Sequence, residues 1–131
     1  MKRKNKDNQL SHPPAKRKIS EMILECAGDF LRLGKTQEHK QCLLNAACTA
    51  WNIACVPVNS RQKAMDRYMT EYQRLNPQMD QAGYADARRD MEKLIEVKLK
   101  LFPMDLRQIV NARFVRVGDQ ERLEAAAITV G

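Results

Sequence analysis

The sequence predicts an α+β fold that is mainly α: about four helices packed around a central apolar helix, followed by a C-terminal antiparallel β-hairpin. Apolar residues recur every three or four positions along residues 19–102, the spacing that puts them on one face of a helix. After Pro103 apolar and polar residues tend to alternate, interrupted by Gly118-Asp119, which indicates two strands joined by a tight turn. The chain has only five glycines and five prolines, so long helices are expected.

The first two helices are separated by Gly34. Ser20 is a good N-cap for the first helix and Gly34 its natural stop. Thr36 can cap the second helix, which is apolar almost all round from Cys42 to Cys55. That pattern is typical of a helix surrounded by others. The first helix has its apolar face at Met22, Ile23, Cys26, Ala27, Phe30 and Leu33.

The third and fourth helices follow Pro57. Asn59 or Ser60 is expected to cap the third, a one-sided surface helix. Asn76-Pro77 then makes either a break or an N-cap followed by proline at the first helical position, and the fourth helix runs to about Phe102. The third helix presents Ala64, Met65, Tyr68, Met69, Tyr72 and Leu75; the fourth is buried through Tyr84, Ala87, Met91, Leu94, Ile95, Leu101 and Phe102.

The hairpin is expected over about residues 108–130, with Gly118-Asp119 as a two-residue type II′ turn. A four-residue loop, Gly118–Glu121, would instead place Arg116 opposite Leu123, so the two-residue turn is favoured. The favoured register pairs Arg116 with Glu121, Phe114 with Leu123, Arg113 with Glu124 and Ile109 with Ile128. One face then carries Val110, Ala112, Phe114, Leu123, Ala125 and Ala127, and the other Ile109, Val115, Val117, Ala126 and Ile128.

The length of 131 residues is typical of one domain, here residues 19–131. Residues 1–18 contain seven basic side chains and one acid, a net charge of +6, which leaves +1 of the total +7 for the rest of the chain. We expect this segment to be a disordered basic tail that can bind polyanions. Its candidate polyanion-binding residues are Lys2, Arg3, Lys4, Lys6, Lys16, Arg17 and Lys18.

Charged residues follow Met1 directly, which argues against a secretory signal and favours a cytoplasmic protein. The most apolar stretch, Leu43 to Val58, is shorter than the roughly 20 residues that span a bilayer, so no membrane association is expected. The four cysteines lie on expected helical faces without a CxxC pair. They are therefore interpreted as reduced core thiols.

The sequence contains no recognisable catalytic, metal-binding or cofactor motif. His39 and Cys42 are one helical turn apart, but structural zinc needs four convergent ligands. His39 is the only histidine after the basic tail, and it lies at the polar start of its helix. The glycines are scattered, whereas phosphate-binding loops need them clustered. We therefore expect no catalytic residues, no metal and no cofactor.

Trp51 and Asn52 lie inside the most apolar helix. Trp51 is interpreted as a core anchor and Asn52 as a buried amide that bonds a neighbouring group. The alternative is a ligand pocket lined by these two residues and tyrosines.

Two stretches of the chain resemble a pattern in small uncharacterised bacterial proteins. They are Ala50-Trp51-Asn52 leading to Pro57, and Lys98-Leu99-Lys100-Leu101-Phe102-Pro103 leading to Asp105, Arg107 and Ile109. The resemblance covers about half of the chain. It implies a free-standing bacterial domain and transfers no function or site residue.

These observations favour a non-enzymatic interaction or assembly protein. Because the hairpin has apolar residues on both faces and a second strand whose later half lacks charge, we expect a homodimer formed through it. The alternative is a nucleic-acid-associated protein that acts through its basic tail, and an enzyme of unrecognised type is a third hypothesis.

Overall fold

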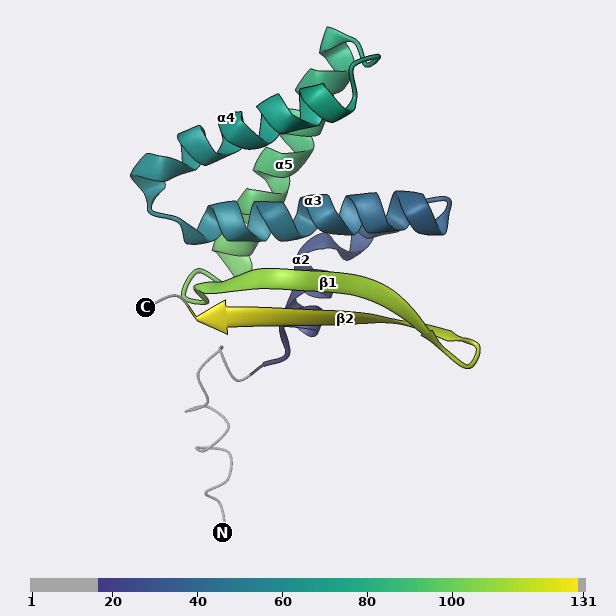
Figure 1. Ribbon diagram of the computed structural model, residues 1–131. Coiled ribbons are helices and arrows are strands. Elements are labelled where there is room, and N and C mark those ends of the chain that lie inside the picture. Colours follow the sequence, from purple (N-terminus) through teal and green to yellow (C-terminus); the bar gives the residue numbers. More distant parts are fainter. Residues whose placement is uncertain (1–16, 130–131) are drawn as a thin grey trace.

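The computed structural model describes residues 17–129, and it confirms the predicted fold class (Figure 1). Four helices precede one antiparallel hairpin in this part of the chain. The expected disorder of residues 1–18 concerns a segment that, apart from Arg17 and Lys18, lies outside the described residues. The elements are α2 (Ile19–Leu31), α3 (Gln37–Cys55), α4 (Val58–Leu75), α5 (Gln81–Leu101), β1 (Arg107–Val117) and β2 (Gln120–Thr129).

Helix α3 is the centre of the molecule. It contacts α2, α4, α5 and β1, and Figure 1 shows it running across the middle, with α4 above it, the hairpin below it and α5 crossing behind it. The expected N-cap is present, since Thr36 Oγ1 accepts a hydrogen bond from the His39 amide. The side chains of α3 that are buried in the core are Leu44, Ala47, Ala50, Trp51, Ile53 and Ala54.

Three helix ends differ from the sequence prediction. Helix α2 begins one residue before Ser20, with Lys18 in the cap position and no side-chain cap. It ends at Leu31, before Gly34, because the amide of Gly34 bonds the Leu31 carbonyl in a tight turn. Helix α4 starts at Val58, since the Pro57 carbonyl already accepts the Ser60 amide, and so neither Asn59 nor Ser60 is its cap.

Asn76-Pro77 lies in the break between α4 and α5 and does not cap α5. The N-cap of α5 is Asp80, whose carboxylate accepts a hydrogen bond from the Gly83 amide at 2.8 Å. A short polar side chain in this position satisfies one of the amides left unpaired at a helix start.

The hairpin has the predicted register over most of its length. Arg116 lies opposite Glu121, and Phe114 opposite Leu123. Gly118 has a φ of 64°, and no non-glycine residue among those described has a positive φ. A left-handed residue at the first turn position alone is the pattern of a type II′ turn.

At the open end of the hairpin, one predicted pair is wrong. The register shifts between Ile109 and Asn111, so Ile109 lies opposite Ala127 and Ile128 lies opposite Gln108. The extra residue, Val110, is exposed, whereas Ile109 is buried in the core. The two residues have therefore exchanged the faces that strict alternation gave them, because a bulge inverts the alternation beyond it.

The inner face of the hairpin packs on α3 and α2. The residues of this face in or against the core are Ile109, Ala112, Phe114, Leu123, Ala125 and Ala127. In residues 17–129, no helix is both long and apolar enough to cross a bilayer.

Candidate functional site

Side chains of α3 bond to the backbone of β1 along one edge of the hairpin. The Asn52 amide donates to the Ile109 carbonyl at 2.9 Å and accepts from the Ile109 amide at 2.7 Å. Trp51 Nε1 donates to the Arg107 carbonyl at 2.8 Å, and Gln41 donates to the Ala112 carbonyl at 3.1 Å. Asn52 therefore takes the place of a neighbouring strand at Ile109, and α3 covers this edge of β1.

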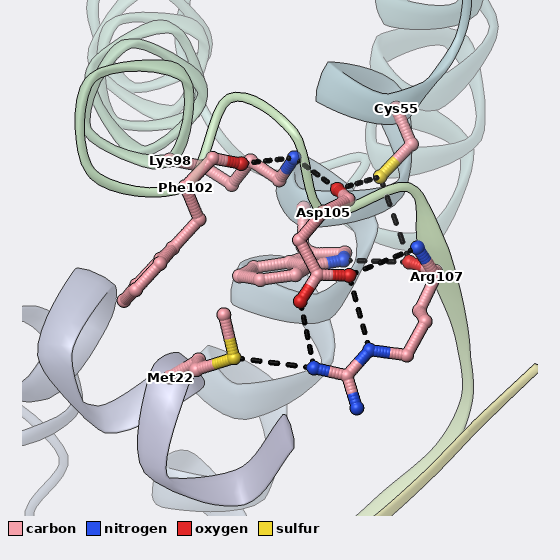
Figure 2. Close-up of polar contacts among 7 residues, drawn as sticks. Met22, Cys55, Lys98, Phe102, Asp105 and Arg107 are labelled. Atoms are coloured by element: carbon pink, nitrogen blue, oxygen red, sulfur yellow. Dashed lines mark hydrogen bonds and ion pairs between the residues drawn. The ribbon is translucent and has the colours of Figure 1, made fainter. Parts of the chain in front are cut away.

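A buried ammonium group lies beside this edge. Lys98, 1% exposed, donates from Nζ to the carbonyls of Phe102 and Asp105 at 2.9 and 2.5 Å. Figure 2 shows Nζ between the end of α5 and the loop that leads to β1. Nζ also lies 4.9 Å from the centre of the Trp51 ring. Carbonyls at a helix C-terminus and an aromatic face both stabilise a cation.

The nearest buried acid is held by Arg107 rather than by Lys98. Asp105 is 2% exposed and accepts hydrogen bonds from the Arg107 amide, Nε and Nη2. Burial alone would raise the pKa of Asp105, but the hydrogen bonds and charge of Arg107 outweigh it, and the pKa is lowered. Arg107 Nη2 also contacts Met22 of α2 at 3.2 Å, so this pair links the loop to α2 (Figure 2).

Cys55 completes the buried polar cluster of Lys98, Asp105 and Arg107. Its Sγ lies 3.6 Å from the Asp105 carbonyl and 3.5 Å from that of Arg107. Burial raises the pKa of this thiol, so it stays protonated at neutral pH and is a poor nucleophile. The cavity beside Trp51 and Lys98 has a volume of about 10 Å³, which is room for one water molecule at most.

A groove with a volume of about 580 Å³ lies between α3, α4 and α5. Tyr68 and Tyr72 of α4 form part of its wall and stack on each other, with ring centres 5.9 Å apart. Burial raises the pKa of Tyr68 to about 12, and burial together with Asp90 raises that of Tyr72, so both hydroxyls stay protonated at neutral pH.

The charged side chains that line this groove in the described part of the chain are all acidic: Glu71 of α4, with Asp86 and Asp90 of α5. Glu71 and Asp86 each also contact an arginine three residues away on the outer surface. Asp90 has no ion-pair partner among residues 17–129. The groove thus combines apolar and aromatic walls with an acidic rim.

The residues selected from the sequence do not meet in one place. Trp51 and Asn52 are at the covered edge of β1, whereas Lys2 to Lys16 of the basic tail lie outside the described residues. Arg17 contacts Glu25 and lies 5.4 Å from the Phe102 ring centre, and Lys18 is exposed. Cys42, expected in the core, is exposed and lines the groove with His39. Residues 17–129 contain no group of three or more metal-ligating side chains.

Sequence reasoning did not select Lys98, Asp105 or Arg107 as site residues. A signal for Lys98 was available, because it follows Met91 and Leu94 at helical spacing and therefore lies on the apolar face of α5. Comparison with known protein families, with curated proteins and with solved structures finds no match to this chain. The resemblance to small bacterial proteins has no counterpart in these comparisons.

Proposed function

We propose that this protein is a non-enzymatic assembly protein that forms a homodimer through its hairpin. The observation that supports the proposal is the difference between the two edges of the sheet. The edge of β1 bonds to Asn52, Trp51 and Gln41 of α3, whereas no side chain in residues 17–129 bonds to the backbone of β2, and the sheet has no third strand there. An unpaired strand edge is a template for pairing with another chain.

The later half of β2 suits such pairing. Residues 125–129 carry no charge, and charged side chains are what usually protect an exposed edge. Ile109 bonds away from β2, so its ladder partner Ala127 directs its own amide and carbonyl to the open edge, because opposed residues of an antiparallel pair either bond each other or both face outward.

The outer face of the hairpin adds apolar area beside this edge. Val110 and Ile128 are 57% and 52% exposed, and Leu106, just before β1, is 56% exposed. Two β2 edges paired about a two-fold axis would make one four-stranded sheet, and two-fold dimers are the commonest oligomers. Burial of Ile128 near that axis would add to the backbone hydrogen bonds.

Sedimentation at micromolar concentration tests the dimer. The unmodified protein should have a dimeric mass, and Ile128→Lys should weaken association at least about tenfold, since it places two like charges near the axis, where about 1.4 kcal/mol corresponds to a factor of ten. Ala127→Pro should act similarly, because it removes an amide that faces the open edge.

Val117→Lys is the matched control for Ile128→Lys. Val117 is similarly exposed, at 50%, but lies on β1 next to the turn, away from the β2 edge. This variant should remain dimeric. A monomeric mass for the unmodified protein, or an equal effect of the two lysine substitutions, would contradict the proposal.

A second candidate function is nucleic-acid association through the basic tail. The charge division favours it: residues 1–18 carry +6, and the rest of the chain only +1. A cationic segment binds phosphates with release of counterions and needs no folded recognition surface.

A further inference from the structure

The groove between α3, α4 and α5 has the chemistry that suits long cationic side chains. Lysine and arginine have an aliphatic stem, which packs on apolar or aromatic surface, and a charged head that needs an acid or a ring face. Tyr68 and Tyr72 supply the aromatic wall, while Glu71, Asp86 and Asp90 supply the carboxylates at the rim.

We propose that the N-terminal segment Lys2–Lys6 of the same chain occupies this groove. The segment has four basic residues among five and no acid, whereas the charged residues lining the groove in the described part are acidic. The charges are therefore complementary, and the stems of the basic residues match the tyrosine wall. This inference is independent of the proposed dimer, because the groove and the β2 edge are formed by different elements.

The length of the connecting chain permits this contact. Arg17, just before α2, contacts Glu25 and the Phe102 ring, while Phe30, in the last turn of α2, lines the groove. A helix of 13 residues is about 20 Å long. The eleven residues from Lys6 to Arg17 can extend to about 36 Å, so Lys2–Lys6 can reach the rim while Arg17 keeps its contacts with Glu25 and Phe102.

Docking of Lys2–Lys6 in the groove would lower the affinity of the tail for polyanions. The same amines cannot contact Asp86 or Asp90 and a phosphate chain at the same time, so the two partners compete. An acidic groove of this kind would hold the basic segment until a polyanion of sufficient charge density displaces it.

Carbodiimide coupling of the full-length protein tests the contact directly, because it joins a lysine amine to a carboxylate only where the two touch. Mass spectrometry should find Lys2, Lys4 or Lys6 coupled to Asp86 or Asp90 several-fold more often than to Asp119 or Glu124. Equal coupling to all four acids would overturn the proposal. So would cross-links that join isotopically heavy and light chains in a mixed sample, since the occupant would then be the tail of a second copy.

Trypsin sensitivity of the tail provides a second test. The double variant Asp86→Asn with Asp90→Asn should be cut at Lys2–Lys6 several-fold faster than the unmodified protein. Both acids are exposed, so the variant is expected to fold. The matched control, Asp119→Asn with Glu124→Gln, removes the same charge from the hairpin and should be cut at the unmodified rate. Equal rates for all three proteins would overturn the proposal.

Discussion

Lys98 and Asp105 are charged residues in the core of the molecule. Different groups replace the water that would otherwise solvate each charge. Lys98 is stabilised by two backbone carbonyls and the Trp51 ring. Asp105 has a bidentate partner in Arg107. Buried charges generally need such partners, and here they hold the end of α5, the loop after it and the start of β1 together.

Asp105→Asn should destabilise the protein by about 3 kcal/mol at neutral pH, because removal of one partner leaves the largely buried Arg107 without its counter-charge. The substitution should also remove the part of the loss of stability at acid pH that is due to Asp105. The pKa of Asp105 is lowered in the folded state, so its contribution is present above the ordinary carboxyl pKa of about 4 and is lost as the pH falls below it toward the folded value.

Urea unfolding at pH 7 and at pH 3 measures both effects. The unmodified protein should lose more stability between these values than Asp105→Asn does. Asp119→Asn in the exposed turn is the control and should stay within about 0.5 kcal/mol of the unmodified protein. An Asp105→Asn variant with unchanged stability and an unchanged pH response would show that the ion pair contributes nothing.

At the scale of elements, Asn52 makes two of the hydrogen bonds that join the hairpin to α3. Asn52 bonds both the amide and the carbonyl of Ile109. Ile109 is next to Val110, the extra residue of the bulge in β1. The bulge and the Asn52 contact therefore belong together, since the bulge places Ile109 in the core with its backbone toward α3.

Asn52→Ala should cost about 2 kcal/mol or more, because it leaves a donor and an acceptor of Ile109 without partners, at about 1–3 kcal/mol for each buried group. Hydrogen exchange at the Ile109 amide should accelerate in step with the lost stability. Asn45→Ala, on the exposed side of the same helix, is the control and should change neither measurement appreciably. Unchanged protection of Ile109 in Asn52→Ala would refute this role.

For the whole molecule, the uneven charge distribution predicts where polyanion affinity resides. A chain that starts at Ile19 should keep its helical circular dichroism and lose most of its binding to nucleic acid, since it loses +6 of the +7 charge. The binding constant of the full-length protein should fall steeply with salt. A plot of its logarithm against the logarithm of the salt concentration should have a slope of about −0.9 for each phosphate neutralised. Equal binding by both chains at low salt would rule out the tail as the site.

The sequence by itself determined the number, order and type of the elements described here, because periods of 3.6 and 2 residues and turn residues such as Gly118-Asp119 are local signals. It also determined that Trp51 and Asn52 belong to the central helix and that most of the positive charge lies before Ile19. Sequence reasoning placed the starts of α2 and α4 wrongly, because each offers competing caps within one turn: Lys18 and Ser20 at α2, and Pro57, Asn59 and Ser60 at α4.

Only the tertiary structure decided how the elements use their polar groups. The sequence places Lys98, Asp105 and Arg107 on a solvated surface, since charged residues are rarely buried without partners. The partners of Lys98, two carbonyls and the Trp51 ring, are brought together by folding. The bulge at Val110 follows directly on Ile109, whose backbone bonds Asn52, 57 residues earlier in the chain. The acidic groove joins carboxylates of α4 and α5 that are far apart in the chain, and the closed edge of β1 exists because α3 packs beside it, which no local pattern contains.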